Sequence, residues 1–292
     1  MRTRGLAVAA LIGAVISGCV PPFAEPAPTL SPTADRPRFD AATYMYALQA
    51  RGTIRIGVLD RDVPFARRDS GGGYVGFEPD LGRELAKALF GQIQSADSVI
   101  EWIPVDRSSA VPALAGGRTD VVIARLVADD ERAAAADLTT PYFATGERIL
   151  VAASNDEIKE LPDLDTKTVC VQGDTGVAER VVGANAFART LSLDTYASCL
   201  GALRAGQVDA IGADEATLWG LRRADADTKI VGRYLLVERY AIGVKKGSAE
   251  RPGFLPFLDG WLAAVIGDGT WARLYETHIK PLSGETRTAP TR

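Results

Sequence analysis

One short pattern occurs twice in this chain and constrains its fold more than any other feature. Residues 113–120 read ALAGGRTD and residues 202–209 read ALRAGQVD, 89 positions further on. In each copy Ala-Leu closes an amphipathic stretch, glycine permits the left-handed residue that ends a helix, and an apolar run follows. The repeat therefore predicts two lobes, each with a helix that leads into a buried strand.

The residues that follow the two apolar runs carry opposite charges. Arg125 comes directly after residues 121–124, and Asp214 comes directly after residues 210–213. In open α/β sheets, ligands bind beyond the carboxyl ends of the strands. A cleft that presents one cation and one anion suits a zwitterion better than a phosphate or a nucleic acid.

Composition and residue types exclude several classes of function. The chain has 292 residues, 47% of them hydrophobic, which suffices for two modest lobes but not for a large multidomain enzyme. No basic stripe with interleaved aromatic residues predicts a nucleic-acid partner. The single histidine, His278, lies near the end of a terminal helical stretch, so Ser-His-Asp or Cys-His catalysis lacks a base. The sequence also lacks a His/Cys cluster, so we expect no metal site. We further expect no cofactor and no enzymatic activity.

The first residues are typical of an export signal. Arg2 and Arg4 precede an apolar run, and small residues precede Cys19, so residues 1–18 resemble a bacterial signal peptide that ends in a lipobox. Lipidated Cys19, followed by a proline-rich tether over 19–38, would hold the exported protein at the outer face of the cell membrane by its lipid alone. The alternatives are an ordinary signal peptide with an incidental cysteine, or a short membrane helix. The apolar run is too short to cross about 30 Å of hydrocarbon.

The two remaining cysteines form an even pair in an exported chain. Cys170 lies in the strand expected at 168–172, and Cys199 lies in the helix expected to lead into the second copy of the repeat. Disulfides persist outside the cytoplasm, so we predict a bond between these cysteines. The alternative is a pair of buried thiols that act as small apolar residues.

Several motifs then match a known family in order. They are residues 74–81 (YVGFEPDL), 129–132 (DDER), 141–143 (PYF), 172–176 (QGDTG), 208–214 (VDAIGAD) and 267–271 (GDGTW). Together they resemble the family 3 solute-binding proteins, the receptors for polar amino acids of ABC importers, over roughly residues 50–280. The chain also resembles actinobacterial glutamine- or glutamate-binding lipoproteins, whose small lobe carries cysteines placed like Cys170 and Cys199.

The resemblance implies an α/β protein with the type II periplasmic-binding-protein fold, in which two hinge crossings join two α/β lobes. Lobe 1 would comprise residues 39–145 and 238–280, lobe 2 residues 146–237, and residues 281–292 would form a C-terminal tail. The crossings are expected near 144–146 and 236–238. It further implies a monomer that closes over its ligand by a hinge motion.

The resemblance also assigns ligand contacts to four positions. Arg132 would bind the α-carboxylate through its guanidinium fork, with Thr175 and Gly176 at a helix start in the other lobe completing the carboxylate site. Asp214 would bind the α-ammonium. From the residues alone, a surface arginine paired with Asp129 or Glu131 is the better interpretation of Arg132, and Asp214 could be a helix N-cap. Glycine-rich helix starts are also common without a ligand.

Further positions bear on which amino acid is bound. Phe65 matches an aromatic residue of the ligand loop, although a core phenylalanine is the alternative. Four positions depart from a glutamine receptor: Arg107 replaces an aromatic residue, Arg125 a glycine or small polar residue, Val127 a threonine, and Gln172 a lysine found in some members. The added arginines would neutralise an acidic side chain, so glutamate or aspartate is favoured over glutamine or asparagine. Alternatively, the arginines are solvated, or Arg125 blocks the pocket of a protein turned sensor.

The predicted function is capture of a polar amino acid and its presentation to an ABC permease. One alternative is a sensor lipoprotein that feeds a transmembrane signalling partner. Another is an enzyme resembling cyclohexadienyl dehydratase, which uses the same fold.

Overall fold

A computed structural model describes residues 36–173 and 175–290. The predicted signal peptide, the lipidation site at Cys19 and most of the tether lie outside the described residues. Their roles stay predictions. Among the described residues, none of the helices combines the length and the apolar composition that a membrane crossing requires.

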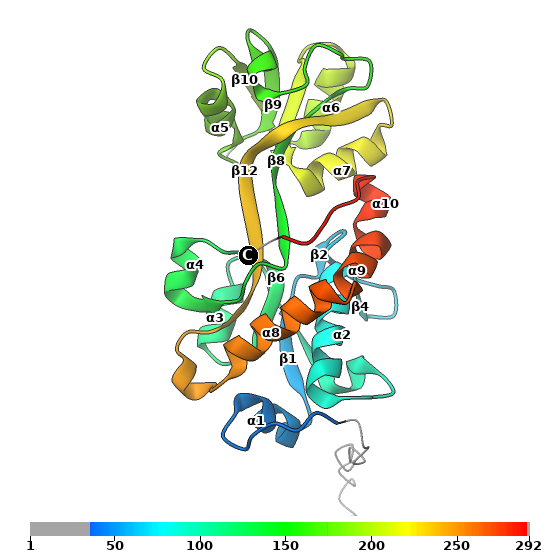
Figure 1. Cartoon of the computed structure of the whole chain (residues 1–292). Helices are drawn as coiled ribbons and strands as arrows, with labels where there is room; N and C mark the ends of the chain where they lie inside the picture. Colours follow the sequence, from blue (N-terminus) through cyan, green and yellow to red (C-terminus); the bar gives the residue numbers. More distant parts are fainter. Residues whose placement is uncertain (1–35, 174, 291–292) are drawn as a thin grey trace, which may run out of the picture. The chain divides into compact units, whose positions relative to one another are not determined.

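In the described part of the chain, one nine-stranded sheet has the order β10-β9-β11-β8-β12-β6-β1-β5, with β7 added beside β12 (Figure 1). Its strands are β1 (Ile54–Val58), β5 (Ile100–Pro104), β6 (Val121–Val127), β7 (Ala136–Leu138), β8 (Phe143–Ala152), β9 (Thr168–Gln172), β10 (Arg189–Leu193), β11 (Ala210–Asp214) and β12 (Thr228–Lys245). Parallel strands β5, β1 and β6 form one half, and parallel strands β10, β9 and β11 form the other. β8 and β12 run antiparallel between the halves.

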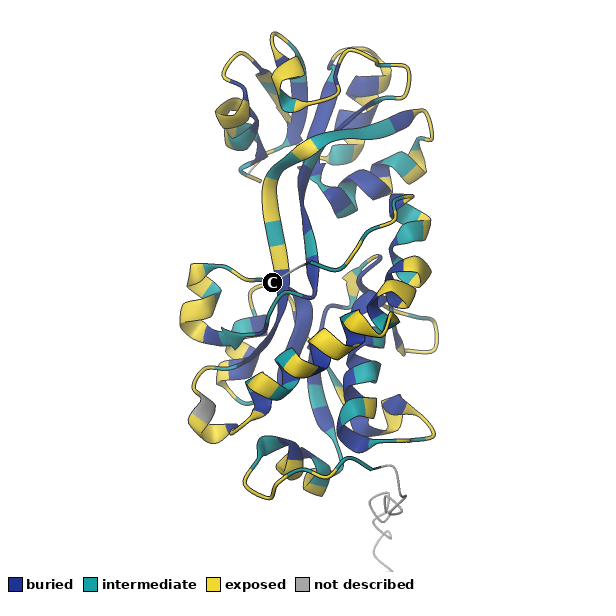
Figure 2. Ribbon diagram, viewed as in Figure 1, coloured by how far each residue is buried: buried dark blue, intermediate teal, exposed yellow. Residues whose placement is uncertain are grey.

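Helices pack beside both halves of this sheet, and a small three-stranded sheet adjoins the first half. The helices are α1 (Tyr44–Arg51), α2 (Phe77–Phe90), α3 (Ala110–Ala115), α4 (Asp130–Ala135), α5 (Val177–Ala184), α6 (Tyr196–Arg204), α7 (Glu215–Ala224), α8 (Phe254–Gly267), α9 (Thr270–His278) and α10 (Lys280–Ser283), with 3₁₀ turns at Ala96–Val99, Leu161–Leu164 and Ser248–Glu250. The small sheet is β2 (Arg61–Asp62), β3 (Ala66–Arg68) and β4 (Tyr74–Val75). Figure 2 shows buried residues concentrated along the strands of both halves.

The repeated pattern forms the same structure twice. α3 ends before Gly117 and leads into β6, and α6 ends before Gly206 and leads into β11; these glycines have φ values of 67° and 66°. The aspartate at the end of each copy then accepts a hydrogen bond from the first parallel strand of its half. Asp120 accepts a hydrogen bond from the backbone N of Arg55 at 2.8 Å, and Asp209 accepts one from Thr168 at 2.7 Å. The expected helix-then-strand arrangement is confirmed in both halves.

Two neighbouring crossings connect the halves. Residues 144–146 of β8 pair in register with residues 237–239 of β12. A Cβ atom at Gly146 would lie 1.8 Å from the carbonyl oxygen of Leu236, so only glycine fits where the two crossings touch. The predicted fold class, two α/β lobes joined by two crossings, is confirmed. The exact lobe limits stay a prediction.

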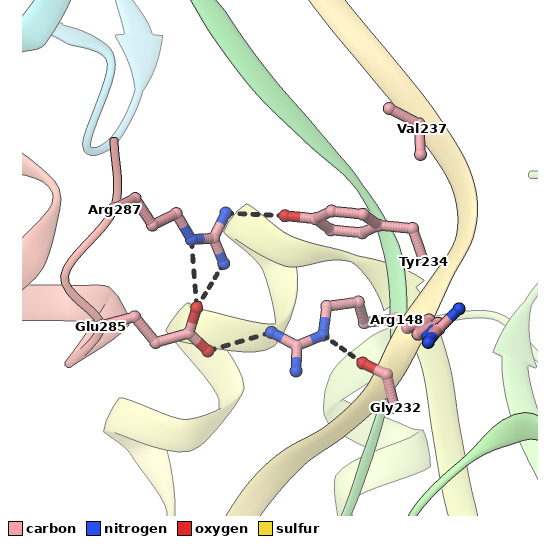
Figure 3. Close-up of a pocket in the computed structure, with 7 residues that line it drawn as sticks. Arg148, Gly232, Tyr234, Val237, Glu285 and Arg287 are labelled. Carbon is pink, nitrogen blue, oxygen red and sulfur yellow. Dashed lines mark hydrogen bonds and ion pairs between the residues drawn. The ribbon is translucent and has the colours of Figure 1, made fainter. Parts of the chain in front are cut away.

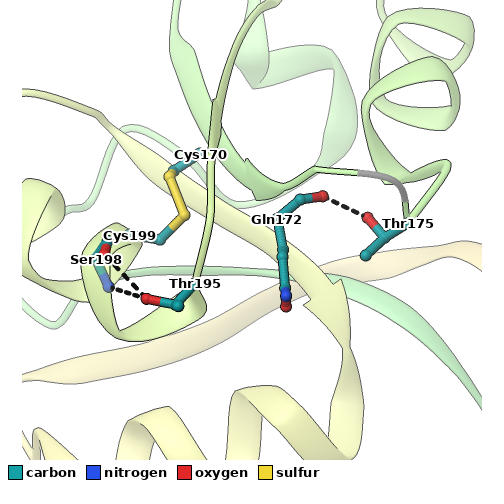
Figure 4. The surroundings of a disulfide bond; sticks show 6 residues. All are labelled: Cys170, Gln172, Thr175, Thr195, Ser198 and Cys199. Atoms are coloured by element: carbon teal, nitrogen blue, oxygen red, sulfur yellow. Dashed lines mark hydrogen bonds between the residues drawn. A yellow bond between two sulfur atoms is a disulfide. The ribbon is translucent and has the colours of Figure 1, made fainter.

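The predicted disulfide is present. Cys170 of β9 and Cys199 of α6 are bonded, with their Cα atoms 5.6 Å apart, and both residues are fully buried (Figure 4). The bond attaches the helix of the second repeat copy to the strand beside it.

Candidate functional site

Arg125 lies at the carboxyl end of β6 with its guanidinium inside the protein. Its side chain is 4% exposed and pairs with Asp62 of β2, with Nη1 2.8 Å from Oδ1. Nη2 and Nε donate to the hydroxyl of Tyr240 at 2.8 and 3.1 Å. The guanidinium carbon also lies 5.0 Å from the ring centre of Phe65 and 5.2 Å from that of Tyr240. Burial by itself lowers the pKa of Arg125, but Tyr240 and the carboxylates of Asp62 and Asp214 outweigh burial and raise it, so the cation is retained.

Asp214 approaches the same guanidinium from the end of β11. Its Oδ1 lies 3.8 Å from Nη2 of Arg125, and its side chain remains 37% exposed. Asp214 also caps α7, because its carboxylate accepts from the backbone N and the hydroxyl of Thr217 at 3.2 and 2.6 Å. The capping alternative and an approach to a cation therefore coexist. The structure brings Arg125 and Asp214 together from the two halves of the sheet.

Arg132 makes a different contact from the one expected on the family pattern. It lies in α4, where Asp129 caps the helix by accepting from the backbone N of Arg132 at 2.8 Å. The guanidinium of Arg132 also pairs with the carboxylate of Asp129. This is the surface pairing named as the alternative. The side chain is about one-third exposed, at 32%, so binding of a ligand carboxylate by Arg132 stays a prediction.

Thr175 and Gly176 lie at the start of α5, as the sequence indicates. Gly176 precedes the helix with φ 69°, and the hydroxyl of Thr175 donates to the carbonyl of Gln172 at 2.8 Å. The guanidinium of Arg180 covers this turn. It donates to the carbonyl of Thr175 at 2.9 Å and pairs with Glu147 of β8. A cation therefore accompanies the helix start that was expected to bind a carboxylate.

The other expected positions differ in their surroundings. Phe65 is fully buried and packs edge-on against Phe143 at 5.0 Å between ring centres, so it is a core residue that also contacts Arg125. Val127 is half-buried and pairs in register with Tyr240. Arg107 is exposed in the turn before α3, and Gln172 is half-buried at the end of β9.

Comparison with known proteins assigns the chain to a family. The model of bacterial extracellular solute-binding proteins, family 3, matches residues 54–281. The chain belongs to this family. The glutamine-binding protein GlnH of an ABC transporter in Bacillus subtilis (strain 168) is 27% identical over 216 residues, or 73% of this chain and 76% of GlnH.

Two solved structures agree with the assignment. The ancestral cationic amino acid solute-binding protein AncCDT-1 has a TM-score of 0.66 at 28% identity, over 81% of this chain and 99% of that one. An ancestral arginine-binding protein, solved with arginine bound, has a TM-score of 0.55 at 34% identity, over 78% of this chain and 99% of its own. The predicted family resemblance is confirmed. This family 3 protein is an amino-acid-binding protein of the ABC transport type, and its family is extracytoplasmic.

Sequence reasoning missed three residues that surround Arg125. Asp62 and Tyr240 hold its guanidinium, and Glu78 of α2 accepts a hydrogen bond from its backbone N at 2.7 Å. Glu78 was visible only as part of the YVGFEPDL motif. It is fully buried and also accepts from the hydroxyl of Tyr142, while its Oε2 has no hydrogen-bond partner among the described residues.

Glu78 is expected to make stability depend on pH. Burial raises the pKa of Glu78 to about 7, although the hydrogen bond from Tyr142 acts in the opposite direction. The folded protein then keeps this proton up to about pH 7, whereas the unfolded chain loses it near pH 4.5. The unfolded state binds fewer protons in this window, so the free energy of unfolding falls as pH rises through it, by up to about 3 kcal/mol.

The measurement is urea unfolding of the wild type and of Glu78→Gln at about pH 5 and about pH 8. In Glu78→Gln, the free energy of unfolding should not show the fall that Glu78 causes between these two pH values. Glu84→Gln on the same helix removes a carboxylate that pairs with Lys87 and Arg273, and this variant should keep the pH dependence of the wild type. If the free energy of unfolding changes with pH to the same extent in Glu78→Gln and in the wild type, Glu78 is not the source of the pH dependence.

A second polar cluster lies where the segment after α10 meets β8, α7 and β12 (Figure 3). Glu215 is fully buried and accepts from both terminal nitrogens of Arg287 at 2.6 and 2.8 Å. Arg148 donates to Glu215 at 3.1 Å and to Glu285 at 2.9 Å, and the hydroxyl of Tyr234 donates to Glu215 at 3.0 Å. Part of the segment expected to be a tail therefore contacts the second half of the sheet.

Proposed function

We propose that this protein captures a polar L-amino acid between its two lobes and presents it to an ABC permease. The proposal rests on one observation, the approach of Arg125 and Asp214 from the ends of β6 and β11. Family membership supports an amino acid as the ligand. The lobes would be residues 39–145 with 238–280 and residues 146–237, and the paired crossings of β8 and β12 would act as the hinge.

In this mechanism the two ends of the ligand bind to different lobes. On its exposed side, the carboxylate of Asp214 accepts hydrogen bonds from the α-ammonium of the ligand. The hydroxyl of Thr217 donates to the same Asp214 carboxylate and holds it in place. Arg132 exchanges its contact with Asp129 for the ligand α-carboxylate, which a guanidinium can bind through two parallel hydrogen bonds. Only a ligand that contacts both lobes stabilises the closed form, and that form is recognised by the membrane partner.

We further propose that the ligand is glutamate or aspartate rather than a neutral amide. Arg125 pairs with Asp62 and approaches Asp214, so a cation already lies beside each carboxylate, while Asp214 keeps an exposed side for the α-ammonium. Because the nitrogens of Arg125 already donate within the protein, the exposed Arg107 is the arginine that would pair with an acidic side chain of the ligand.

Calorimetric titration of the purified protein with glutamate, aspartate, glutamine, asparagine, arginine and cystine tests the proposal. Binding of at least one acidic amino acid is expected, and Asp214→Asn should weaken it about 100-fold, because the ammonium loses its charged partner. Asp225→Asn, at the opposite end of α7, removes a carboxylate bound to Arg204 and should bind normally. Unchanged affinity in Asp214→Asn would refute the role of this residue.

The partner and the anchor need separate measurements. Recovery of ABC permease subunits from membranes by the ligand-loaded protein supports import, whereas recovery of a signalling receptor supports the sensor alternative. Conversion of the ligand would support the enzyme alternative. Mass spectrometry of the protein from native membranes tests the proposed lipid on Cys19.

A further inference from the structure

A side chain of the protein itself occupies the space between the ends of β6 and β11. The guanidinium of Arg125 has carboxylates on two sides, with Asp62 at 2.8 Å and Asp214 at 3.8 Å. The rings of Phe65 and Tyr240 lie within 5.2 Å of its carbon, measured to the ring centres. Carboxylates combined with aromatic faces form the environment that binds a free guanidinium group.

We propose that Arg125 is a specificity-determining residue that fills a guanidinium pocket with the chain's own cation and so excludes cationic amino acids. The inference rests on the proposed function, because it assumes that the amino acid binds at this junction of the lobes.

Three properties of Arg125 support this role. Its side chain is almost fully buried and its guanidinium lies beside the carboxylates of Asp62 and Asp214, so a ligand guanidinium would have to compete with it for their negative charge. Its hydrogen bonds to Asp62 and Tyr240 use all three nitrogens, which leaves few donors for a ligand carboxylate. Its backbone also has φ 48°, in the left-handed region that residues other than glycine rarely adopt. The contacts of the side chain therefore hold this residue in a conformation that is otherwise unfavourable.

The backbone conformation also makes a clean test possible. Glycine adopts positive φ without strain, so Arg125→Gly empties the pocket without opposing the local backbone. The variant leaves Asp62 and Asp214 facing an empty space beside the two aromatic rings. A small cation that resembles the removed guanidinium group should bind in this space. Methylguanidinium matches that group in size, charge and hydrogen-bond donors.

The experiment is calorimetric titration of methylguanidinium and of L-arginine into the wild type, Arg125→Gly and Arg125→Met. Arg125→Gly should bind both at least about 10-fold more tightly than the wild type. Arg125→Met keeps the pocket filled by an uncharged chain and should gain no affinity. The proposal is overturned if Arg125→Gly gains no affinity for methylguanidinium, or if the wild type already binds arginine as tightly as the variant.

Thermal unfolding covers the case in which the emptied variant folds poorly. Methylguanidinium chloride at millimolar concentration should restore a cooperative unfolding transition to Arg125→Gly, and the same concentration of sodium chloride should not. Absence of this rescue counts against the proposal. Failure of the proposed function gives a different result, because the wild type would then bind none of the amino acids tested while the methylguanidinium rescue of Arg125→Gly persisted.

Discussion

Replacement of Glu215 by alanine is expected to lower the free energy of unfolding by about 3–5 kcal/mol. Glu215 is fully buried, and it is the shared acceptor of Arg148, Arg287 and the hydroxyl of Tyr234. Its removal leaves two guanidinium groups that are each about 15% exposed, with Glu285 as their remaining carboxylate. A buried cation without a full counter-charge cannot recover its hydration.

Urea unfolding followed by circular dichroism measures this effect. Glu250→Ala is the matched control, because it removes a glutamate from the exposed pair with Lys245, where Glu250 is 70% exposed. Surface pairs of this kind contribute less than about 1 kcal/mol. A Glu215→Ala variant as stable as the control would show that the cluster contributes little to stability.

Loss of the disulfide is expected to lower the free energy of unfolding by about 3.5 kcal/mol, because the bond restricts the unfolded chain. Cys170 and Cys199 are 29 positions apart, and the loop between them contains α5 and β10. The double variant Cys170→Ala, Cys199→Ala removes the constraint and keeps both positions apolar in the surrounding core.

Unfolding of the wild type and of the double variant, each with and without reductant, gives the measurement. Reductant should lower the stability of the wild type toward that of the double variant and should leave the variant unchanged. A thiol count confirms that the wild type has been reduced. If fully reduced wild type unfolds at the same urea concentration as the oxidised protein, the bond does not stabilise this fold.

Local patterns in the sequence predicted much of the fold. The glycines that end α3 and α6 act through their own backbone conformation, so their effect can be read without knowledge of distant contacts. The terminal helical stretch expected to end near His278 illustrates the same point, because it is α9 and its last residue is His278. The disulfide followed from export and from the even number of remaining cysteines.

The candidate site was less predictable, because a charged side chain can pair with a neighbour, with a ligand or with a residue distant in the sequence. For Arg132 the sequence predicted a ligand carboxylate, with a pair to Asp129 or Glu131 as the alternative, and only the structure shows the pair with Asp129. Arg125 was expected to face an acidic ligand or to block the pocket, but nothing in the sequence indicated Asp62 and Tyr240 as its partners. Those residues are 63 and 115 positions away, so no local pattern links them to Arg125.

The sequence by itself determined the two α/β halves, the glycine-ended helices before β6 and β11, and the family. These features depend on hydrophobic periodicity and on backbone conformations that neighbouring residues impose. Only the tertiary structure decided which charges are buried and what neutralises them, at Arg125 and again at Glu215. A charge can be buried only where distant segments bring counter-charges and hydrogen bonds to it, and that meeting is a property of the folded chain.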